Sequence, residues 1–427
     1  MSPSQLAMNG GDPVWTRGWP VWPIGDESTQ EAVIDVVKSG RWTISGPATG
    51  KRTEEARFSE EFASYLRCAY CVPVDHGTSA LILALESVGV CHGSEVIVPG
   101  MTWVACAEAV VALGAVPVMV DVDPVTMCLD PQLVAEAITD RTSAIMCVHL
   151  YCSVADIGVL SELARVHDLP IIEDCAQAHG AIWRGSFVGT IGRVGTFSMQ
   201  QGKPLTSGEG GCCVTDDPGI AERIYLMRTN GRRLKTGGIP LGQMDLEEIG
   251  GAFGRNACIS EFQCAILRAQ LGRLDEQIER RRSAVRFLER RLAEFDWVRT
   301  PKPAPGTDRI SVYHWVTMLD RSAFSHRSIE KIAEAVSAEL GAWVHPCYTP
   351  LSRNRLYTPL ASPLARQDPE LARRLDPRRV SLPVCEELRA NCLAFHHPML
   401  LAEEDGLRAV ISALCKVQRE SDKIPMD

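Results

Sequence analysis

Short apolar runs alternate with stretches of helical periodicity from residue 54 to about residue 217. Strands this apolar, separated by helices, are typical of a mostly parallel sheet with helices on both faces. The pattern therefore predicts an α/β fold. The expected strands are residues 95–99, 117–122, 144–150, 170–173, 195–199 and 211–215, and the expected helices are residues 79–88, 105–113, 133–138 and 159–167.

The remainder of the chain has a different organisation. We expect one long helix over residues 259–295, a Pro-rich loop at 300–307, a strand at 312–319 and helices near 329–340 and 403–420. A chain of 427 residues exceeds what one hydrophobic core usually serves. We therefore predict two domains: a large one over residues 1–270, including an N-terminal extension, and a smaller α+β domain over residues 271–427.

Composition excludes several classes of partner. The chain has 44 Lys and Arg against 53 Asp and Glu, a net charge of −9, and no basic stripe, which argues against nucleic acid and anionic membranes. No apolar run approaches the roughly 18 residues of a membrane span, and residues 1–11 lack the order of a signal peptide, so we expect a cytoplasmic protein. The sixteen cysteines are scattered through apolar segments, and Cys68-Ala69-Tyr70-Cys71 has no second pair, so we predict structural thiols and no metal site.

One lysine is held by backbone on both sides. Lys203 follows a short apolar strand and precedes a Gly-rich turn, in the segment Ser198-Met199-Gln200-Gln201-Gly202-Lys203-Pro204-Leu205-Thr206-Ser207-Gly208-Glu209-Gly210-Gly211. A lysine confined in this way can be desolvated, which lowers its pKa and frees the amine for Schiff-base chemistry. The partner that would use such an amine is pyridoxal phosphate (PLP).

Candidates for the other groups that PLP needs lie where the predicted strands end, the edge at which such sheets bind ligands. Asp174 follows a strand and could pair with the pyridine nitrogen, although an Asp there could also be a helix N-cap. Trp103 could stack on the ring, with a core position as the alternative. Gln177 could contact the ring oxygen of the cofactor. His179 could assist the site without touching the cofactor, or it could be an ordinary packed residue.

A phosphate site is predicted at the start of one helix. Gly77, Thr78 and Ser79 run from a strand into a helix, where backbone N–H groups and hydroxyls can bind an anion. Ser198 could add another hydroxyl. The alternative is that Thr78 and Ser79 only cap the helix.

These motifs together resemble a known family. Asp174-Cys175-Ala176-Gln177-Ala178-His179-Gly180, the segment from Ser198 through Lys203 to Gly211, and Gly77-Thr78-Ser79-Ala80-Leu81 occur in an order that resembles the DegT/DnrJ family of sugar aminotransferases. Members are PLP enzymes of fold type I, related to aspartate aminotransferase. The resemblance implies the cofactor roles given above, with Lys203 as the Schiff-base lysine and proton carrier.

The resemblance also implies a homodimer with shared active sites. Gly254-Arg255-Asn256 matches a family segment whose Asn reaches the phosphate bound by the neighbouring subunit. The chain departs from the family next to it, because Ala257 and Cys258 replace a more usual aromatic–Arg pair.

A narrower resemblance concerns the amino acceptor. Several segments are similar to the cyclitol branch, which includes the glutamine:scyllo-inosose and 2-deoxy-scyllo-inosose aminotransferases of aminoglycoside biosynthesis. This implies transfer from L-glutamine or L-glutamate to a keto-cyclitol. The segments are residues 15–23, 40–46, 148–151, 198–201 and 355–357. His149, Tyr151, His345 and Tyr348 are interpreted as possible lining of the acceptor pocket.

Alternatives remain open at this point. One is an aminotransferase for a nucleotide-linked keto-sugar. Another is a dehydrating PLP enzyme similar to the 3-amino-5-hydroxybenzoate synthases, which share Gly202. Sugar 3-dehydratases carry His where Lys203 stands, which argues against that form. A non-catalytic protein with a PLP-enzyme fold is a third alternative. A dinucleotide-binding protein is set aside because the chain lacks G-x-G-x-x-G after the first strand.

Overall fold

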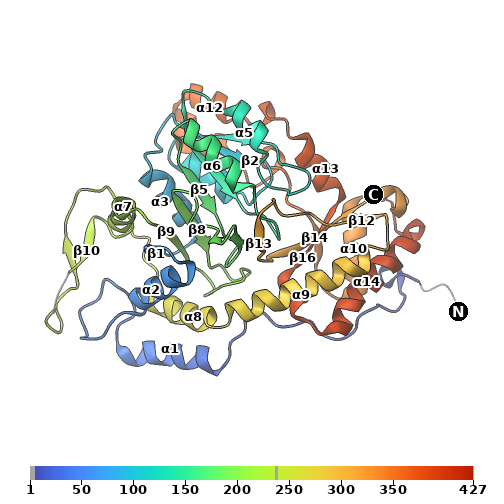
Figure 1. Ribbon diagram of the computed structural model, residues 1–427, viewed down its shortest axis with the longest axis horizontal. Helices are drawn as coiled ribbons and strands as arrows, with labels where there is room; N and C mark the ends of the chain where they lie inside the picture. Colours follow the sequence, from blue (N-terminus) through green and yellow to red (C-terminus); the bar gives the residue numbers. More distant parts are fainter. Residues whose placement is uncertain (1–4, 236–238, 427) are drawn as a thin grey trace.

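The computed structural model describes residues 5–235 and 239–426. Within them, a seven-stranded sheet has the order β1-β9-β8-β5-β4-β2-β3 (Figure 1). The five strands from β8 to β3 pair in parallel, whereas β9 is antiparallel to both β8 and β1, which confirms the mostly parallel sheet. The bounds are β1 Tyr70–Val74, β2 Glu95–Pro99, β3 Val116–Val120, β4 Thr142–Val148, β5 Ile171–Asp174, β8 Val194–Ser198 and β9 Gly211–Thr215.

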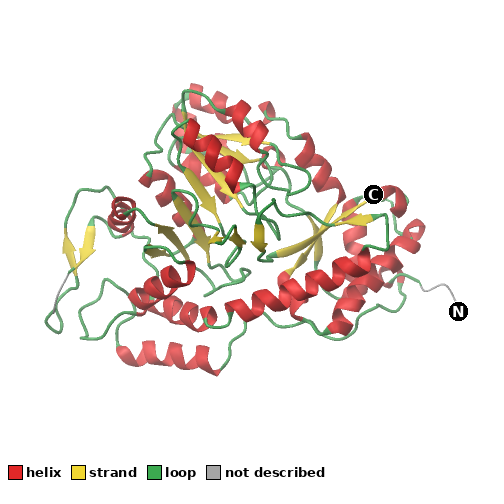
Figure 2. Ribbon diagram, in the orientation of Figure 1, coloured by secondary structure: helices red, strands yellow, loops and turns green. Residues whose placement is uncertain are grey.

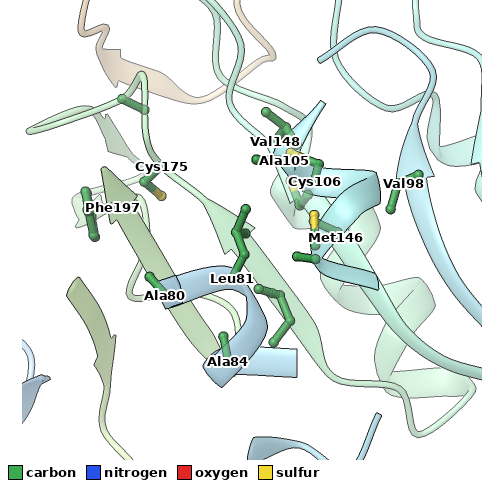
Figure 3. Packing of buried hydrophobic residues seen from close by; sticks show 14 of the residues in the cluster. Ala80, Leu81, Ala84, Val98, Ala105, Cys106, Met146, Val148, Cys175 and Phe197 are labelled. Carbon is green, nitrogen blue, oxygen red and sulfur yellow. The ribbon is translucent and has the colours of Figure 1, made fainter. Parts of the chain in front are cut away.

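Helices pack closely on this sheet (Figure 2). Helix α3 contacts β8 and β9, α4 and α5 contact β3, and α2 and α7 contact β1. Figure 3 shows Ala80, Leu81 and Ala84 of α3 beside side chains of the strands, Phe197 among them. The bounds are α2 Glu54–Leu66, α3 Gly77–Ser87, α4 Ala105–Ala112, α5 Pro131–Ala137, α6 Ile157–Val166 and α7 Pro218–Arg228.

The predicted long helix over residues 259–295 is wrong in one respect, because the structure divides it into α8 (Glu261–Leu271) and α9 (Leu274–Leu292). Gly272 lies at the break, where glycine favours interruption of a helix. Arg273 leaves the helical conformation (φ −113°, ψ 1°), and its guanidinium binds the carboxylate of Asp26 and the hydroxyl of Thr29. Those two residues begin α1 (Glu27–Ser39), so the break fixes α1 against the rest of the chain.

A second, antiparallel sheet has the order β12-β14-β16-β15. Its strands are β12 Val298–Arg299, β14 His314–Leu319, β15 Val344–Pro346 and β16 Cys392–His396. It shares a separate hydrophobic core with α9, α10 (Ile329–Leu340) and α14 (Glu404–Arg419), centred on Trp315 and Phe395. This arrangement confirms the smaller α+β unit.

The residues of the two hydrophobic cores are not separated by one boundary in the sequence. Residues between 347 and 388, including Leu351, Leu371 and Cys385, pack in the core of the large sheet. This segment contains α11 (Pro363–Gln367), α12 (Pro369–Leu375) and α13 (Pro383–Asn391), and α12 contacts β3. The predicted domain limits at residues 270 and 271 remain a prediction.

The N-terminal segment packs on the second core. Leu6 is buried there, and the buried Glu339 carboxylate accepts the backbone N–H groups of Ala7 and Val14 at 2.8 and 3.1 Å. The Lys416 ammonium donates to the same carboxylate at 2.8 Å. One ion pair therefore joins the N-terminal segment, α10 and α14.

The remaining strands are short. β6 (Ile182–Trp183), β7 (Ser186–Phe187) and β13 (Thr307–Arg309) form a three-stranded sheet, and β10 (Arg232–Leu234) pairs with β11 (Leu246–Glu248). In the part of the chain that the structure describes, no helix has the length and apolar character to span a bilayer.

Candidate active site

A cavity of about 500 Å³ opens where β4, β5 and β8 end, facing the second sheet. Its volume lies within the roughly 300–1,000 Å³ of small-molecule sites. Among the residues that line it are seven of the nine predicted site residues: Gly77, Thr78, Trp103, Asp174, Gln177, Ser198 and Lys203. The lining does not include Ser79, in the first turn of α3, or Asn256, which is exposed.

Lys203 is buried in this cavity, with 9% of its surface exposed. Burial lowers the pKa of its amine from 10.5 to about 8, although the nearby Asp174 and Cys106 act in the opposite direction. The Nζ atom lies 4.1 Å from the centre of the Tyr313 ring and makes no hydrogen bond within the described residues. The amine is therefore poorly solvated, unpaired by hydrogen bonds and directed into the cavity.

The backbone around Lys203 is fixed from several directions. The turn after it closes through Gly208, which has φ +87° and accepts the Gln201 N–H at 2.7 Å. The carbonyl of Gly202 accepts hydrogen bonds from the Nε2 atoms of His396 and His397 at 3.1 and 2.9 Å. A carbonyl can only accept, so both imidazoles carry a proton on Nε2. Two histidines at the end of β16, His396 within the strand and His397 just after it, thus hold the residue before the lysine.

A tryptophan from the N-terminal segment adds to this support. The Trp22 indole N–H donates to the carbonyl of Gln201 at 3.0 Å. Its ring meets the His397 ring edge-on, with centroids 4.7 Å apart. The lysine loop is therefore held between the N-terminal segment and the second sheet.

Asp174 ends β5 and faces the cavity. Its Oδ1 accepts the N–H of Ala176 at 2.9 Å, and its Oδ2 accepts the thiol of Cys106 at 3.0 Å. Burial, and then the charge of Asp174, raise the pKa of that thiol well above its usual range, so the thiol is protonated and donates. No helix follows Asp174 directly, so the alternative of a helix N-cap is excluded.

The first turn of α3 is open to an anion. His76 occupies the N-cap position, and its side chain makes no capping hydrogen bond, so the N-cap residue does not occupy the amides of the first turn. A Cβ atom on Gly77 would lie 2.5 Å from the Cβ of Ser198, so only glycine allows the helix start to approach β8 this closely. N–H groups and a hydroxyl at a helix N-terminus favour a phosphate.

Two further predicted residues border the same space. The Gln177 Oε1 accepts the N–H of Tyr151 at 2.8 Å, and its Nε2 lies 3.4 Å from the hydroxyl of Tyr348, which lines the cavity. Trp103 is 48% exposed, and its ring centroid lies 6.0 Å from that of Tyr348. The alternative of a core position for Trp103 is therefore wrong.

These groups fit one kind of ligand. The Lys203 amine suits a carbonyl, the Asp174 carboxylate suits a protonated ring nitrogen, and the start of α3 suits a phosphate. The three sites line one cavity of adequate size. The residues present thus fit PLP.

His149 and Tyr151, interpreted from sequence as acceptor-pocket residues, are not part of the cavity lining. Both are buried, whereas His345 and Tyr348 line the cavity. The His149 Nδ1 accepts the N–H of Ala155 at 3.2 Å, so its Nε2 is protonated and donates to Glu173 at 3.1 Å. His149 is therefore a structural residue.

Glu173 is the buried partner of this histidine. Burial would raise the pKa of its carboxyl, but the hydrogen bonds from His149 and from the amides of Gly189 and Gly192 outweigh burial and lower it. Glu173, His149 and Cys175 lie close enough to resemble a metal site. Both ring nitrogens and the carboxylate are already engaged, and burial raises the pKa of the Cys175 thiol, so the cluster is better explained as packing.

Other lining residues were missed by sequence reasoning. Tyr313, His314, Trp343 and His396 belong to the second sheet or adjoin it, far from Lys203 in sequence. The tandem pair His396-His397 at the end of a strand was the one local signal that could have drawn attention to them.

The chain was compared with known proteins. Residues 23–393 match the profile of the DegT/DnrJ/EryC1/StrS aminotransferase family. The L-glutamine:2-deoxy-scyllo-inosose aminotransferase of Streptoalloteichus tenebrarius is 46% identical over 422 residues, 99% of each chain. The L-glutamine:scyllo-inosose aminotransferase of Streptomyces griseus is 44% identical over 414 residues, 97% of each chain. The crystal structure of 3-amino-5-hydroxybenzoic acid synthase is similar with a TM-score of 0.77 and 32% identity, covering 94% of this chain and 98% of that one.

Proposed function

Because the chain belongs to the DegT/DnrJ/EryC1/StrS aminotransferase family and is an aminotransferase, we propose that it transfers an amino group from L-glutamine to a keto-cyclitol of the scyllo-inosose type. The observation that carries this proposal is the 44–46% identity, along nearly the whole chain, to relatives named for that reaction. The natural setting of the reaction would be the biosynthesis of aminocyclitol antibiotics.

We propose PLP as the cofactor. Lys203 would hold it, Asp174 would pair with its ring nitrogen, Gln177 would contact its ring oxygen and Trp103 would stack on it. Gly77, Thr78, Ser79 and Ser198 would bind its phosphate. When bound, PLP supplies an electron sink for the substrate carbon that loses its proton.

The protein's own part in the reaction is proton transfer at Lys203 Nζ. With a pKa of about 8, about a tenth of the amines are unprotonated at pH 7, against about 0.03% for a lysine of pKa 10.5. A neutral amine can take the α-proton of the donor amino acid and later deliver a proton to the acceptor carbon. Asp174 would stabilise positive charge on the ring nitrogen of the cofactor. Its carboxylate accepts hydrogen bonds from the Cys106 thiol and the Ala176 N–H, which hold it in place.

We also propose a homodimer in which Asn256 reaches the phosphate site of the partner. Asn256 is exposed and lies outside the cavity of its own chain. Large apolar side chains near it are exposed as well, and Phe253, at 91%, is the extreme case. Exposed apolar surface of this kind is typical of an interface.

We place the protein in the cytoplasm. Within the described residues, which include all sixteen cysteines, every thiol is unpaired. Disulfides are rare in reducing compartments, so this state supports the assignment.

The test is an amino-transfer assay with purified protein and L-glutamine or L-glutamate as donor. The acceptor panel contains scyllo-inosose, 2-deoxy-scyllo-inosose and a nucleotide-linked keto-sugar. We expect turnover with the two free cyclitols and loss of both turnover and visible cofactor absorbance in Lys203→Ala. Turnover with the nucleotide-linked sugar alone would contradict the cyclitol assignment.

A second candidate is a dehydrating enzyme, favoured by the similarity to 3-amino-5-hydroxybenzoic acid synthase. An enzyme of this kind would dehydrate a ring ketone and release an aromatic product. Ultraviolet absorbance of the products separates the two, because an aminocyclitol has no aromatic chromophore.

A further inference from the structure

One wall of the cavity is made of imidazole and aromatic rings from the second sheet. His314, His345 and His396 come from three neighbouring strands, β14, β15 and β16, and all three line the cavity. The His314 ring centroid lies 5.1 Å from that of His345 and 5.1 Å from that of His396. Trp343 stacks on His345 at 4.1 Å, and Tyr313 lies 4.3 Å from His314. We call these five residues the imidazole wall.

The wall runs from the lysine to the outside of the cavity. At its inner end the Tyr313 ring lies beneath Lys203 Nζ. At its outer end Trp343 is 73% exposed. A molecule whose carbonyl carbon lies at Lys203 would therefore extend along the wall.

The hydrogen bonds define what the wall can offer. His345 Nδ1 donates to the carbonyl of Pro346 at 2.8 Å, so its Nε2 accepts from His314 Nε2 at 3.3 Å. His396 donates through Nε2 to Gly202, so its Nδ1 carries a lone pair, and this atom makes no hydrogen bond within the described residues. The wall thus presents an imidazole acceptor and an exposed indole face.

The wall also lacks positive charge. Burial lowers the pKa of His314, His345 and His396, with neighbouring histidines or arginines adding to the effect, so the three rings are neutral at pH 7. Among the described residues that line the cavity there is no arginine, and Lys203 is the sole lysine. Asp174 and Glu209 add negative charge. A neutral imidazole acceptor suits a hydroxyl group of a ligand, and an aromatic face suits the C–H face of a ligand ring. The diphosphate of a nucleotide-linked sugar would instead need cationic side chains.

We propose that the imidazole wall binds the amino acceptor, and that it selects an uncharged polyhydroxylated ring over a nucleotide-linked sugar. The inference rests on the proposed function and adds to it the residues that recognise the acceptor. One ring hydroxyl donates to His396 Nδ1, and a C–H face of the ring packs on Trp343.

Two variants test the wall. Trp343→Ala removes an exposed side chain. His396→Phe removes the acceptor atom and also the hydrogen bond from His396 to Gly202, while His397 still donates to Gly202. His167→Phe, at an exposed position just after α6, is the matched control. Each half-reaction is measured separately. The half-reaction with L-glutamine is followed by the loss of visible cofactor absorbance, and the half-reaction with 2-deoxy-scyllo-inosose is followed by the return of that absorbance.

We expect KM for the cyclitol to rise about 10-fold in each variant, as for the loss of a hydrogen bond or a stacking contact of roughly 1.4 kcal/mol. The rate of the L-glutamine half-reaction should remain within about 2-fold of wild type in Trp343→Ala, and His167→Phe should match wild type in both half-reactions. An unchanged cyclitol KM, or an equal loss in both halves, would overturn the inference and leave the proposed function intact.

A binding measurement separates this failure from failure of the proposed function. Scyllo-inositol is uncharged and has no carbonyl, so calorimetry of its binding to the cofactor-free protein does not depend on turnover. If wild type aminates no cyclitol, the proposed function fails. The wall inference then stands only if Trp343→Ala and His396→Phe weaken scyllo-inositol binding, and equal or undetectable binding in all three proteins overturns it as well.

Discussion

Replacing Lys203 with methionine should stabilise the cofactor-free protein at neutral pH. Burial lowers the pKa of the amine from 10.5 to about 8, and each pKa unit corresponds to about 1.4 kcal/mol. At pH 7 the folded protein therefore carries a penalty of about 3 kcal/mol for keeping this amine charged, which an apolar side chain of similar length does not carry. The enzyme would retain this penalty because the chemistry needs the amine.

The pH dependence gives the prediction its sign. Between pH 8 and 10.5 the unfolded chain binds more protons at this residue than the folded one, so wild type gains stability as pH rises. The advantage of Lys203→Met should therefore be largest below pH 8 and disappear near pH 10.5. Denaturant unfolding of both cofactor-free proteins at several pH values measures it.

The matched control is Lys302→Met, because Lys302 is exposed. It should leave the free energy of unfolding unchanged at every pH. The reasoning is refuted if Lys203→Met and wild type are equally stable at pH 7, or if their difference does not change with pH.

Three further outcomes are expected. Asp174→Asn should lower the pKa of Lys203 below about 8, because the negative charge of the Asp174 carboxylate raises the pKa of this amine in wild type, and the reactivity of the amine as a function of pH measures this change. The same variant should reduce kcat by about 100-fold or more, as measured by steady-state kinetics. Gly77→Ala should weaken PLP binding about 10-fold, since its Cβ would meet Ser198, and equal affinity in a fluorescence titration would contradict the phosphate site. Glu173→Gln should lower the free energy of unfolding by about 1–3 kcal/mol, because its amide NH2 group would face N–H donors that the carboxylate now accepts, and an unchanged denaturation midpoint would be evidence against those hydrogen bonds.

The parts of the fold predicted from sequence are those with a local signal. The strands over residues 95–99 and 211–215 have the predicted bounds because buried parallel or central strands consist mostly of apolar residues. The break between α8 and α9 was not predicted, since the apolar pattern continues through Gly272, and Arg273 leaves the helix only to reach a residue almost 250 positions away.

The candidate site shows the same division. Lys203 and Asp174 occur in short motifs at strand ends, so their side chains meet once the sheet is formed. His314, His345 and His396 have no such motif, because they become neighbours only through pairing between strands of the second sheet. His149 lies at the end of a predicted strand, where a polar residue is expected to face a ligand, but its ring points to Glu173, and strand position alone does not specify that direction.

The contact between the N-terminal segment and Glu339 has a consequence for synthesis. Residues 6–15 leave the ribosome long before their contacts exist. The acceptor for Ala7 and Val14 is translated more than 300 residues later, and the lysine that pairs with this acceptor more than 400 residues later. The strands of the large sheet are complete in sequence by Thr215, so they can pair while the ribosome is still working, before residues 347–388 complete the core of this sheet. The second core must wait for Lys416, and until then Leu6 has no buried site to occupy. Residues 6–15 are thus among the last parts of the molecule to reach their native position.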